Sequence, residues 1–347
     1  MAKKLTIKQI AQLSGVSAGT VDRVLHNRGR VSEEAYAKVR KVLDKQDYRR
    51  NIHTSAVSLK KTFRLAVAIP RSEKGEYWDL IRDGIIEAEV EYSDISMDTF
   101  FCFFDQFDSL SCKEVFEGIP DINPSAVIIG TTFVEETKRL CEVLEAQNIP
   151  YVFVDGFVDG TKPVAVFSAN QDICGRILAR MMDAFTPETG DIAIFHPKRK
   201  GTMFSNNSLL RLKAFKEYFR EEGKLSKLKE GYFSINNPDA VIEEVSEFLK
   251  LYPNVGGISV LISTGYIIAD ALSALGRTDI CVGGFDITAN NARCLLDGSL
   301  DMAVSQRPET QGFDAVEYVV RYLLYSTLGP QTPGTVNVQI VLKENLS

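Results

Sequence analysis

Polar and aromatic side chains directly follow several apolar runs of this sequence. They are Tyr77, Trp78, Asp155, Asn170, Thr264, Asp286 and Gln306. An aromatic ring packs well against the C–H face of a sugar, while carboxylate and amide groups form paired hydrogen bonds with neighbouring hydroxyls. The set therefore predicts a binding site for a polyol, a sugar or a sugar derivative. Each residue also has a structural alternative: the rings as core, and Asp286 as a cap at a strand end.

These side chains need a scaffold in which several strand ends meet. From Phe63 onward, short β-rich runs alternate with helical patterns; the runs are residues 65–69, 126–130, 151–155, 165–169, 191–196, 258–263, 280–286 and 302–306. Such alternation predicts parallel sheets covered by helices on both faces, and about 280 residues suit two sheets better than one. Ligand sites in open α/β folds lie at the carboxyl ends of strands, so we expect the polar residues in a cleft between two lobes.

The first 64 residues differ in charge from the rest of the chain. They contain 15 Lys and Arg against 5 Asp and Glu, whereas the remainder contains 25 against 41. A basic segment joined to an acidic body is typical of a polyanion-binding module, because each phosphate contact draws on local positive charge. A solvated basic tail has the same charge, so the pattern within the segment must decide.

Three short helices are predicted in this basic segment. Thr6 and Gln9 have the spacing of a capping box at the start of the first helix. Gly15 permits a tight turn, Ser17 can cap a second helix, and a third is expected to begin after Ser32. The order and spacing predict a helix-turn-helix domain.

The segment resembles the headpiece of the lactose-repressor (LacI) family. The resemblance rests on Thr6-Ile7-Lys8-Gln9-Ile10-Ala11, Gly15-Val16-Ser17, Thr20-Val21-Asp22-Arg23-Val24-Leu25, Val31-Ser32 and Tyr48. In that family the second helix lies in the major groove of DNA. The resemblance implies base contacts by Ala18, Gly19 and Arg23, and phosphate contacts by Thr6, Ser17, Thr20, Asn27 and Ser32. Arg23 is the main specificity residue expected, since its guanidinium can bond a guanine at two points; the alternative is a solvated helix residue.

After the headpiece, the family has a hinge helix that inserts a leucine into the minor groove. Residues 48–59 occupy its place, and Asn51 fits the pattern. Arg50 stands where proline is usual, Thr54 where alanine is usual, and Val57 at the leucine position. Valine is shorter and forms helices less readily, so insertion at Val57 is less favourable than in the family.

Residues 64 to 345 resemble the type I periplasmic sugar-binding fold that forms the core of the same family. According to the resemblance, Tyr77 and Trp78 match an aromatic pair that faces the ligand, and Arg211 matches a ligand-binding arginine. Asp286 and Gln306 match the family's aspartate and glutamine. Arg211 has an ion-pair role as its alternative. Three departures leave the ligand's identity open: Thr264 for asparagine or aspartate, Ala169 for aspartate, and Gly156 for arginine.

The expected fold is a small all-α helix-turn-helix DNA-binding domain followed by a two-lobed α/β periplasmic-binding-protein-like (type I) domain. The headpiece is expected over residues 1–50, a hinge over 51–63 and the ligand-binding core over 64–347. Within the core, lobe 1 should contain about residues 64–164 and 308–328, and lobe 2 about 165–307 and 329–347. The chain would then cross between the lobes three times, which allows a hinge that opens without unfolding either core.

The resemblance implies a ligand-responsive, sequence-specific DNA-binding transcription regulator, with repression as the family default. A sugar held between the lobes would shift the hinge equilibrium and change the spacing of two headpieces in a homodimer on a near-palindromic operator. The implied partners are double-stranded operator DNA, a small-molecule effector and a second copy of the chain. A C-terminus without leucine heptads does not predict a coiled-coil tetramer.

Other classes of protein fit the sequence less well. The six cysteines are scattered, and the chain has no P-loop, no G-x-S-x-G, no metal-ligand spacing and no dinucleotide fingerprint. We therefore expect no metal, no cofactor and no enzymatic activity. The polar start and the lack of any apolar run of roughly 18 residues predict a cytoplasmic protein without a membrane span. A sugar-binding protein without a DNA role would share the body and is the alternative.

Overall fold

The computed structural model describes residues 7–26, 31–32, 35–39, 42, 62–198, 206–325 and 336–346. The chain divides into two compact units, Met1–Leu59 and Lys60–Ser347. This division lies inside the segment expected to be a hinge. Four residues expected to contact DNA lie outside the described residues: Thr6, Asn27, Asn51 and Val57.

The first unit contains a helix-turn-helix. Its first two helices are α1 (Ile7–Ser14) and α2 (Ala18–His26), and residues 35–39 are again helical. Gly15 has a φ of +67° in the turn, a conformation that favours glycine. Ile10, Val21 and Val39 are fully buried against one another, so one apolar residue from each helical segment forms the centre of this small core.

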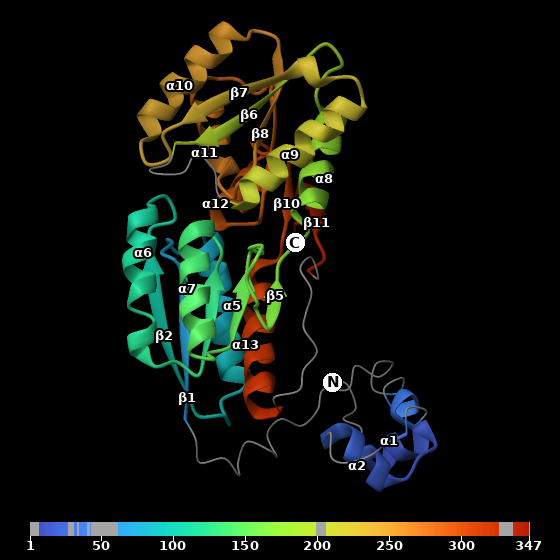
Figure 1. Cartoon of the computed structure of the whole chain (residues 1–347). Helices are drawn as coiled ribbons and strands as arrows, with labels where there is room; N and C mark the ends of the chain where they lie inside the picture. Colours follow the sequence, from blue (N-terminus) through green and yellow to red (C-terminus); the bar gives the residue numbers. More distant parts are fainter. Residues whose placement is uncertain are drawn as a thin grey trace. The chain divides into compact units, whose positions relative to one another are not determined.

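In the second unit, five parallel strands form the sheet of lobe 1, in the order β2-β1-β3-β4-β5. They are β1 (Phe63–Pro70), β2 (Met97–Phe104), β3 (Ala126–Gly130), β4 (Tyr151–Val154) and β5 (Ala165–Phe167). The helices of this lobe are α5 (Tyr77–Glu91), α6 (Ser109–Glu117), α7 (Val134–Ala146), the short η1 (Pro120–Ile122) and α13 (Pro308–Tyr325). Figure 1 shows α13, from the far end of the chain, beside α5 on this sheet. The sheet is therefore covered on both faces, as parallel sheets require.

The sheet of lobe 2 has six strands in the order β11-β10-β9-β8-β6-β7, all parallel except β11, which is antiparallel to β10. They are β6 (Asp191–Pro197), β7 (Leu228–Phe233), β8 (Val255–Val260), β9 (Cys281–Phe285), β10 (Met302–Ser305) and β11 (Gln339–Val341). The helices are α8 (Gln171–Phe185), α9 (Asn206–Glu221), α10 (Pro238–Leu251), α11 (Gly265–Ala274), α12 (Ala289–Asp297) and the short η2 (Leu225–Lys227) and η3 (Lys343–Asn345).

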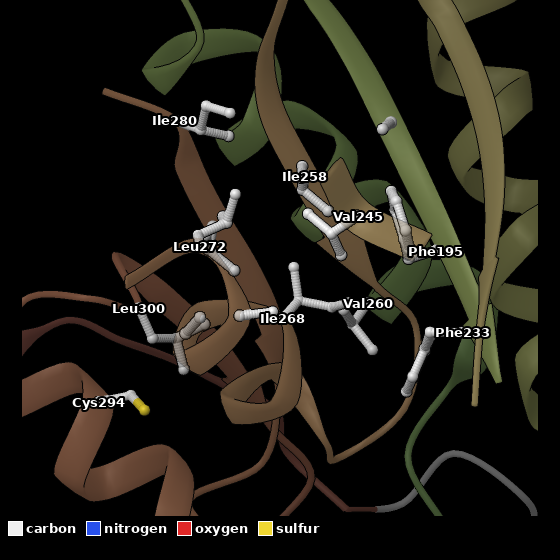
Figure 2. Packing of buried hydrophobic residues seen from close by; sticks show 14 of the residues in the cluster. Phe195, Phe233, Val245, Ile258, Val260, Ile268, Leu272, Ile280, Cys294 and Leu300 are labelled. Carbon is white, nitrogen blue, oxygen red and sulfur yellow. The ribbon is translucent and has the colours of Figure 1, made fainter. Parts of the chain in front are cut away.

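Two hydrophobic clusters hold lobe 2 together, one on each face of its sheet. Helices α8 and α9 pack on one face. On the other, Phe195 and Phe233 from the strands belong to one cluster with Val245 of α10, Ile268 of α11 and Cys294 of α12, and Figure 2 shows its labelled members. The two layers fix the strand ends from which the polar residues of the cleft emerge.

The structure differs from the sequence-based expectation at three places. Lobe 1 was expected to end near residue 164, but β5 continues its sheet to Phe167 because the backbone of residues 165–167 pairs with β4. Strands β2 and β7 were not predicted. Both are edge strands, which pair on one side only and are partly exposed. Strand β7 includes Lys229 and Glu230 and has no continuous apolar run, whereas β2 has one at residues 100–104 that was not assigned to a strand.

Two described segments carry the chain between the lobes. Residues 168–170 connect β5 to α8, and residues 306–307 connect β10 to α13. The N–H of Val336, which precedes β11, donates to the carbonyl of Ser168 over 3.3 Å. The crossings lie at the carboxyl ends of β5 and β10, where Asn170, Gln306 and their neighbours were expected to form a site.

Within the described ranges, no helix is long and apolar enough to cross a membrane. The same part of the chain holds no group of three or more His, Cys, Asp or Glu side chains arranged to bind a metal ion.

Candidate functional site

A cavity of about 530 Å³ lies between the two lobes. Its size is within the range of small-molecule sites, roughly 300–1,000 Å³. Six of the eight expected ligand-binding residues line it: Tyr77, Trp78, Asp155, Arg211, Thr264 and Gln306. The structure therefore brings together side chains that are more than 200 residues apart in the sequence.

Tyr77 and Trp78 form one wall of this cavity from the first turn of α5. Their rings meet edge to face, with centroids 5.3 Å apart. The Tyr77 hydroxyl donates to Asp155 Oδ1 over 2.7 Å, and Trp78 Nε1 donates to Gln106 Oε1 over 3.3 Å. Both polar ends are thus held by the protein, which leaves apolar ring surface for a ligand.

Asp155 and Asp286 directly follow β4 and β9, and both have left-handed backbones, with φ of +73° and +58°. This region favours Gly, Asn and Asp, because longer or branched side chains are strained there. The Asp155 N–H donates to Phe167 O and to Gln311 Oε1, and the Asp286 N–H donates to Val304 O. These bonds fix the turn that ends each strand.

Arg211, on α9, is the centre of a buried hydrogen-bond network. Its Nε donates to Gln171 Oε1 over 2.7 Å, its Nη1 to the Leu261 carbonyl over 2.9 Å and its Nη2 to Gln306 Oε1 over 2.6 Å. The guanidinium lies 4.2 Å from the centroid of the Phe285 ring, and the residue is only 3% exposed. Every nitrogen of Arg211 therefore has a partner within the protein before any ligand binds.

Two expected ligand-binding residues do not line the cavity. Asp286 is fully buried beneath it, where it accepts hydrogen bonds from Ser263 Oγ over 2.7 Å and from Gln306 N and Nε2 over 2.8 and 2.9 Å. Asn170 is exposed and caps α8, accepting from the Ile173 N–H over 3.1 Å. The expectation of direct ligand contact is thus corrected for both: Asp286 positions Gln306, and Asn170 ends a helix.

Burial shifts the ionisation of the acidic groups in this cleft. Burial raises the pKa of Asp155 to about 6, although Arg211 and the Tyr77 hydroxyl favour its charged form. Burial also raises the pKa of Asp286 and of Glu76, and it raises the pKa of Tyr77 well above its usual value. Tyr77 therefore stays neutral and remains a hydrogen-bond donor.

Three amide side chains of the network were not predicted. Gln171 Nε2 donates to the carbonyls of Asp155 and Ala169 and to Gln306 Oε1; Asn207 Nδ2 donates to the Asp155 carbonyl over 2.8 Å; Gln311 Nε2 donates to the Gln306 carbonyl over 3.0 Å. A signal for Asn207 was present in the sequence, since it lies four residues before Arg211 on the same face of α9.

Several cavity oxygens have no hydrogen-bond partner among the described residues. They are Asn207 Oδ1 and the hydroxyls of Thr131, Thr132 and Thr264. A buried polar atom left without a partner costs free energy, roughly 1–3 kcal/mol. A polar ligand or ordered water that bonds these oxygens would recover that free energy.

The lobes also contact each other at the edge of the cleft. The Ala289 N–H donates to the Gly75 carbonyl over 2.9 Å, and Asn290 Nδ2 donates to Glu76 Oε1 over 3.0 Å. The Gly75 N–H in turn donates to Asp79 Oδ2 over 2.7 Å. These bonds tie the loop before α5 in lobe 1 to the start of α12 in lobe 2.

In the first unit, α2 exposes the residues expected to contact DNA. Ser17, Ala18, Gly19 and Arg23 are exposed, and Thr20 is half-buried. Ser17 Oγ accepts from the Thr20 N–H over 3.1 Å. Arg23 Nε donates to the Gly19 carbonyl over 3.1 Å, which leaves the end of its guanidinium on the exposed face. Exposed Ser32 accepts from the Ala35 N–H over 3.4 Å at the start of the next helical segment.

Two family models match the chain. Residues 6–51 match the model described as bacterial regulatory proteins, lacI family, and residues 65–326 match the periplasmic binding protein domain. The second match covers more than half of the chain. Together the two matches account for the helix-turn-helix unit and for both lobes.

Among curated proteins, the chain is 35% identical over 79 residues to the HTH-type transcriptional regulator DegA of Bacillus subtilis, which is 23% of each chain. The matched part thus spans about a quarter of the length of this relative. Among solved structures, a Bacteroides fragilis protein provisionally assigned as a LacI transcriptional regulator is 25% identical, with a TM-score of 0.77 over 82% of this chain and 99% of that one. The complex of the transcriptional regulator CelR with cellobiose is 17% identical, with a TM-score of 0.61 over 98% of this chain and 99% of that one, and so shows the shared fold.

Proposed function

This chain belongs to the LacI family of bacterial regulatory proteins, and we propose that it is a ligand-responsive, sequence-specific DNA-binding transcription regulator. The observation that carries the proposal is the presence in one chain of an exposed helix-turn-helix face and a polar, aromatic cavity between two lobes. The first can bind DNA, and the second can bind the molecule that regulates it.

The DNA-binding role is supported by α2 and by the charge of its segment. Ala18, Gly19 and Arg23 are exposed on one helix, in the positions that meet base edges when such a helix lies in the major groove. The surplus of positive charge in the first 64 residues provides the phosphate contacts that orient the helix. The operators expected for this family are near-palindromic, and a homodimer matches that symmetry with one headpiece on each half-site. The proposed site of action is the cytoplasm, where bacterial DNA lies.

The effector role is supported by the chemistry of the cavity. Ring surface from Tyr77 and Trp78 meets the polar groups of Asp155, Thr264 and Gln306. A sugar or related polyol matches this combination, because it has both an apolar C–H face and several hydroxyls. The fold neighbour CelR is a regulator in complex with cellobiose, which has the same chemistry.

Coupling between effector binding in one unit and DNA binding in the other requires no covalent reaction. A ligand that contacts both lobes stabilises one hinge angle over others, and the protein's affinity for DNA then changes by the difference between those states. The bonds from Ala289 and Asn290 to the loop of Gly75 and Glu76 show that the lobes have specific contacts in one such state.

The test uses the full-length protein in two steps. Selection from random duplex DNA first identifies the operator, and the affinity is then measured at several salt concentrations; we expect a steep fall of affinity with salt. Trp78, the single tryptophan, then reports effector binding, since it lines the cavity. A sugar that changes both the emission of Trp78 and the affinity for the operator supports the proposal.

The alternative is a sugar-binding protein without a DNA role, which would share both lobes. Saturable sugar binding with no selected DNA sequence would favour this alternative. Turnover of a sugar would instead indicate an enzyme, a class for which neither family model gives support.

A further inference from the structure

Three side chains of the cavity lining, Arg211, Tyr77 and Asn207, donate their hydrogen bonds to the protein, and this bears on what the cavity can bind. The nitrogens of Arg211 bond Gln171, Leu261 and Gln306, as described above. The Tyr77 hydroxyl and Asn207 Nδ2 also donate to protein acceptors, both of them on Asp155. A phosphate or carboxylate group of a ligand needs strong hydrogen-bond donors, and these three side chains have few N–H or O–H groups left to offer it.

The acceptors are in the opposite situation. Asn207 is 5% exposed, and its Oδ1 has no partner among the described residues. The orientation of its amide is fixed because Nδ2 donates to the Asp155 carbonyl. Thr131 Oγ1 is likewise buried and without a partner in the part of the chain that the structure describes. Both oxygens approach Gly156 from the same side: a Cβ there would lie 2.6 Å from the asparagine oxygen and 2.7 Å from the threonine oxygen.

The charge of the lining is also unbalanced. Among the described residues, four carboxylates and two arginines line the cavity, and of these Arg71, Glu73 and Asp105 are exposed. The charge of Arg211 is already shared between two buried carboxylates, since it favours the ionised forms of both Asp155 and Asp286. The second arginine, Arg71, is an exposed side chain. The carboxylates that line the cavity with it are Glu73, Glu76, Asp105 and Asp155.

We propose that the effector is an aminated polyol, such as an amino sugar, whose ammonium group binds beside Asp155 and the side-chain oxygens of Asn207 and Thr131. An ammonium brings three donors for the oxygens of Asn207 and Thr131, and it adds a positive charge beside Asp155, which shares the charge of Arg211 with Asp286. It would offset the free-energy cost that burial imposes on the Asp155 carboxylate. The inference rests on the proposed function and narrows its effector class.

The experiment is a fluorescence titration of the full-length protein at pH 7, where amino sugars are mostly in the ammonium form, with matched sets of compounds. D-glucosamine, D-galactosamine and D-mannosamine are compared with D-glucose, D-galactose and D-mannose, with the three N-acetylated amino sugars and with glucose 6-phosphate. We expect at least one free amine to bind about tenfold or more tightly than its neutral and N-acetylated counterparts. If no amine binds, or if a neutral or phosphorylated sugar binds as tightly, the proposal is overturned.

Two carboxylate-to-amide variants test whether the charge of Asp155 causes the preference for an amine. Asp155→Asn keeps the shape and suits the left-handed backbone, so we expect it to abolish the preference for the amine. Asp159→Asn is the matched control, because it makes the same change at an exposed turn residue of the same segment outside the cavity lining. A preference that survives in Asp155→Asn would place the amine elsewhere and contradict the proposed site.

The proposed function and this inference can fail separately. If a neutral sugar binds and changes operator affinity, the proposed regulatory function is supported and the proposed aminated effector is rejected. If an amino sugar binds with the expected preference but leaves DNA binding unchanged, the proposed ligand class is supported and the proposed regulatory function is rejected.

Discussion

The backbone N–H of Ala289 donates a 2.9 Å hydrogen bond to the carbonyl of Gly75, which joins lobe 2 to lobe 1 at the edge of the cleft. Gly75 has a φ of +80°, and a Cβ on it would lie 2.8 Å from the Cβ of Ala289. Both the conformation and the close approach therefore depend on the absence of a side chain at residue 75.

Replacing this glycine should separate the two lobes. Gly75→Ala introduces backbone strain of ~1–3 kcal/mol and a steric clash across the cleft, so we expect faster hydrogen–deuterium exchange at the Ala289 amide. Gly160→Ala is the matched control, since Gly160 has a φ of +84° and no atom within 4 Å of the added Cβ. Equal protection of the Ala289 amide in the two variants would show that the contact between lobes does not depend on Gly75.

Arg211 should matter for stability even without ligand. Arg211→Met leaves the buried carboxylates of Asp155 and Asp286 without their compensating charge, which should lower the free energy of unfolding in urea by ~3–5 kcal/mol. Arg176→Met, which breaks an exposed pair with Glu221, should lower the free energy of unfolding much less, because solvent screens that pair. Adding Asp286→Asn to Arg211→Met should restore part of the loss; no recovery would mean that charge compensation is not the cause.

The buried Asp155 should make stability depend on pH. Its pKa of about 6 lies above the ~3.9 of an unfolded chain, so the folded state holds the proton more tightly and stability from this group is lost as the pH rises from about 4 through 6. Asp155→Asn removes that loss. The variant should therefore gain ~1–3 kcal/mol over the native protein between pH 4 and pH 8.

Urea unfolding at several pH values measures this difference, with Asp159→Asn as the control. Arg211, Tyr77 and Asp286 all face Asp155 and are the same in both proteins, so their own contributions cancel to a first approximation. A difference between native protein and Asp155→Asn that does not change with pH would contradict the raised pKa.

Arg23 should contact a base of the operator and contribute to sequence specificity. Arg23→Ala should relax the preference at one position of each half-site, with a loss of roughly 1–3 kcal/mol of discrimination there. Gln12→Ala, at an exposed position of α1, is expected to leave the preference unchanged. Binding selections on all four bases at each position make the comparison, and an unchanged preference in Arg23→Ala would assign the residue to solvent.

Much of the fold could be predicted because buried parallel strands have near-continuous apolar sequences. The run at residues 126–130 coincides with β3, and the runs around Ile69 and Phe195 locate β1 and β6. The edge strand β7 could not be found in this way, since it contains Lys229 and Glu230 and is only partly buried. Its place is set by pairing with β6, which no local pattern reveals.

The site could be predicted less completely. Strand ends pointed to Tyr77, Asp155 and Gln306, and the fold brings these three residues together at the cavity. Asn170 and Gln171 are adjacent and both polar, and only the start of α8 decides that the first caps the helix while the second bonds Arg211. For Arg211, the family resemblance implied a ligand contact, but it could not show that all three guanidinium nitrogens are bonded within the protein.

The left-handed backbones of Asp155 and Asp286 also restrict how this protein can evolve. At each position the conformation readily admits Asn, Asp or Gly, so few single substitutions are accessible without strain. Thr264, which also lines the cavity, has a φ of −119° and carries no such restriction. A lineage that acquires a new effector should therefore vary first at positions like Thr264, while the two aspartates stay the same or change to asparagine.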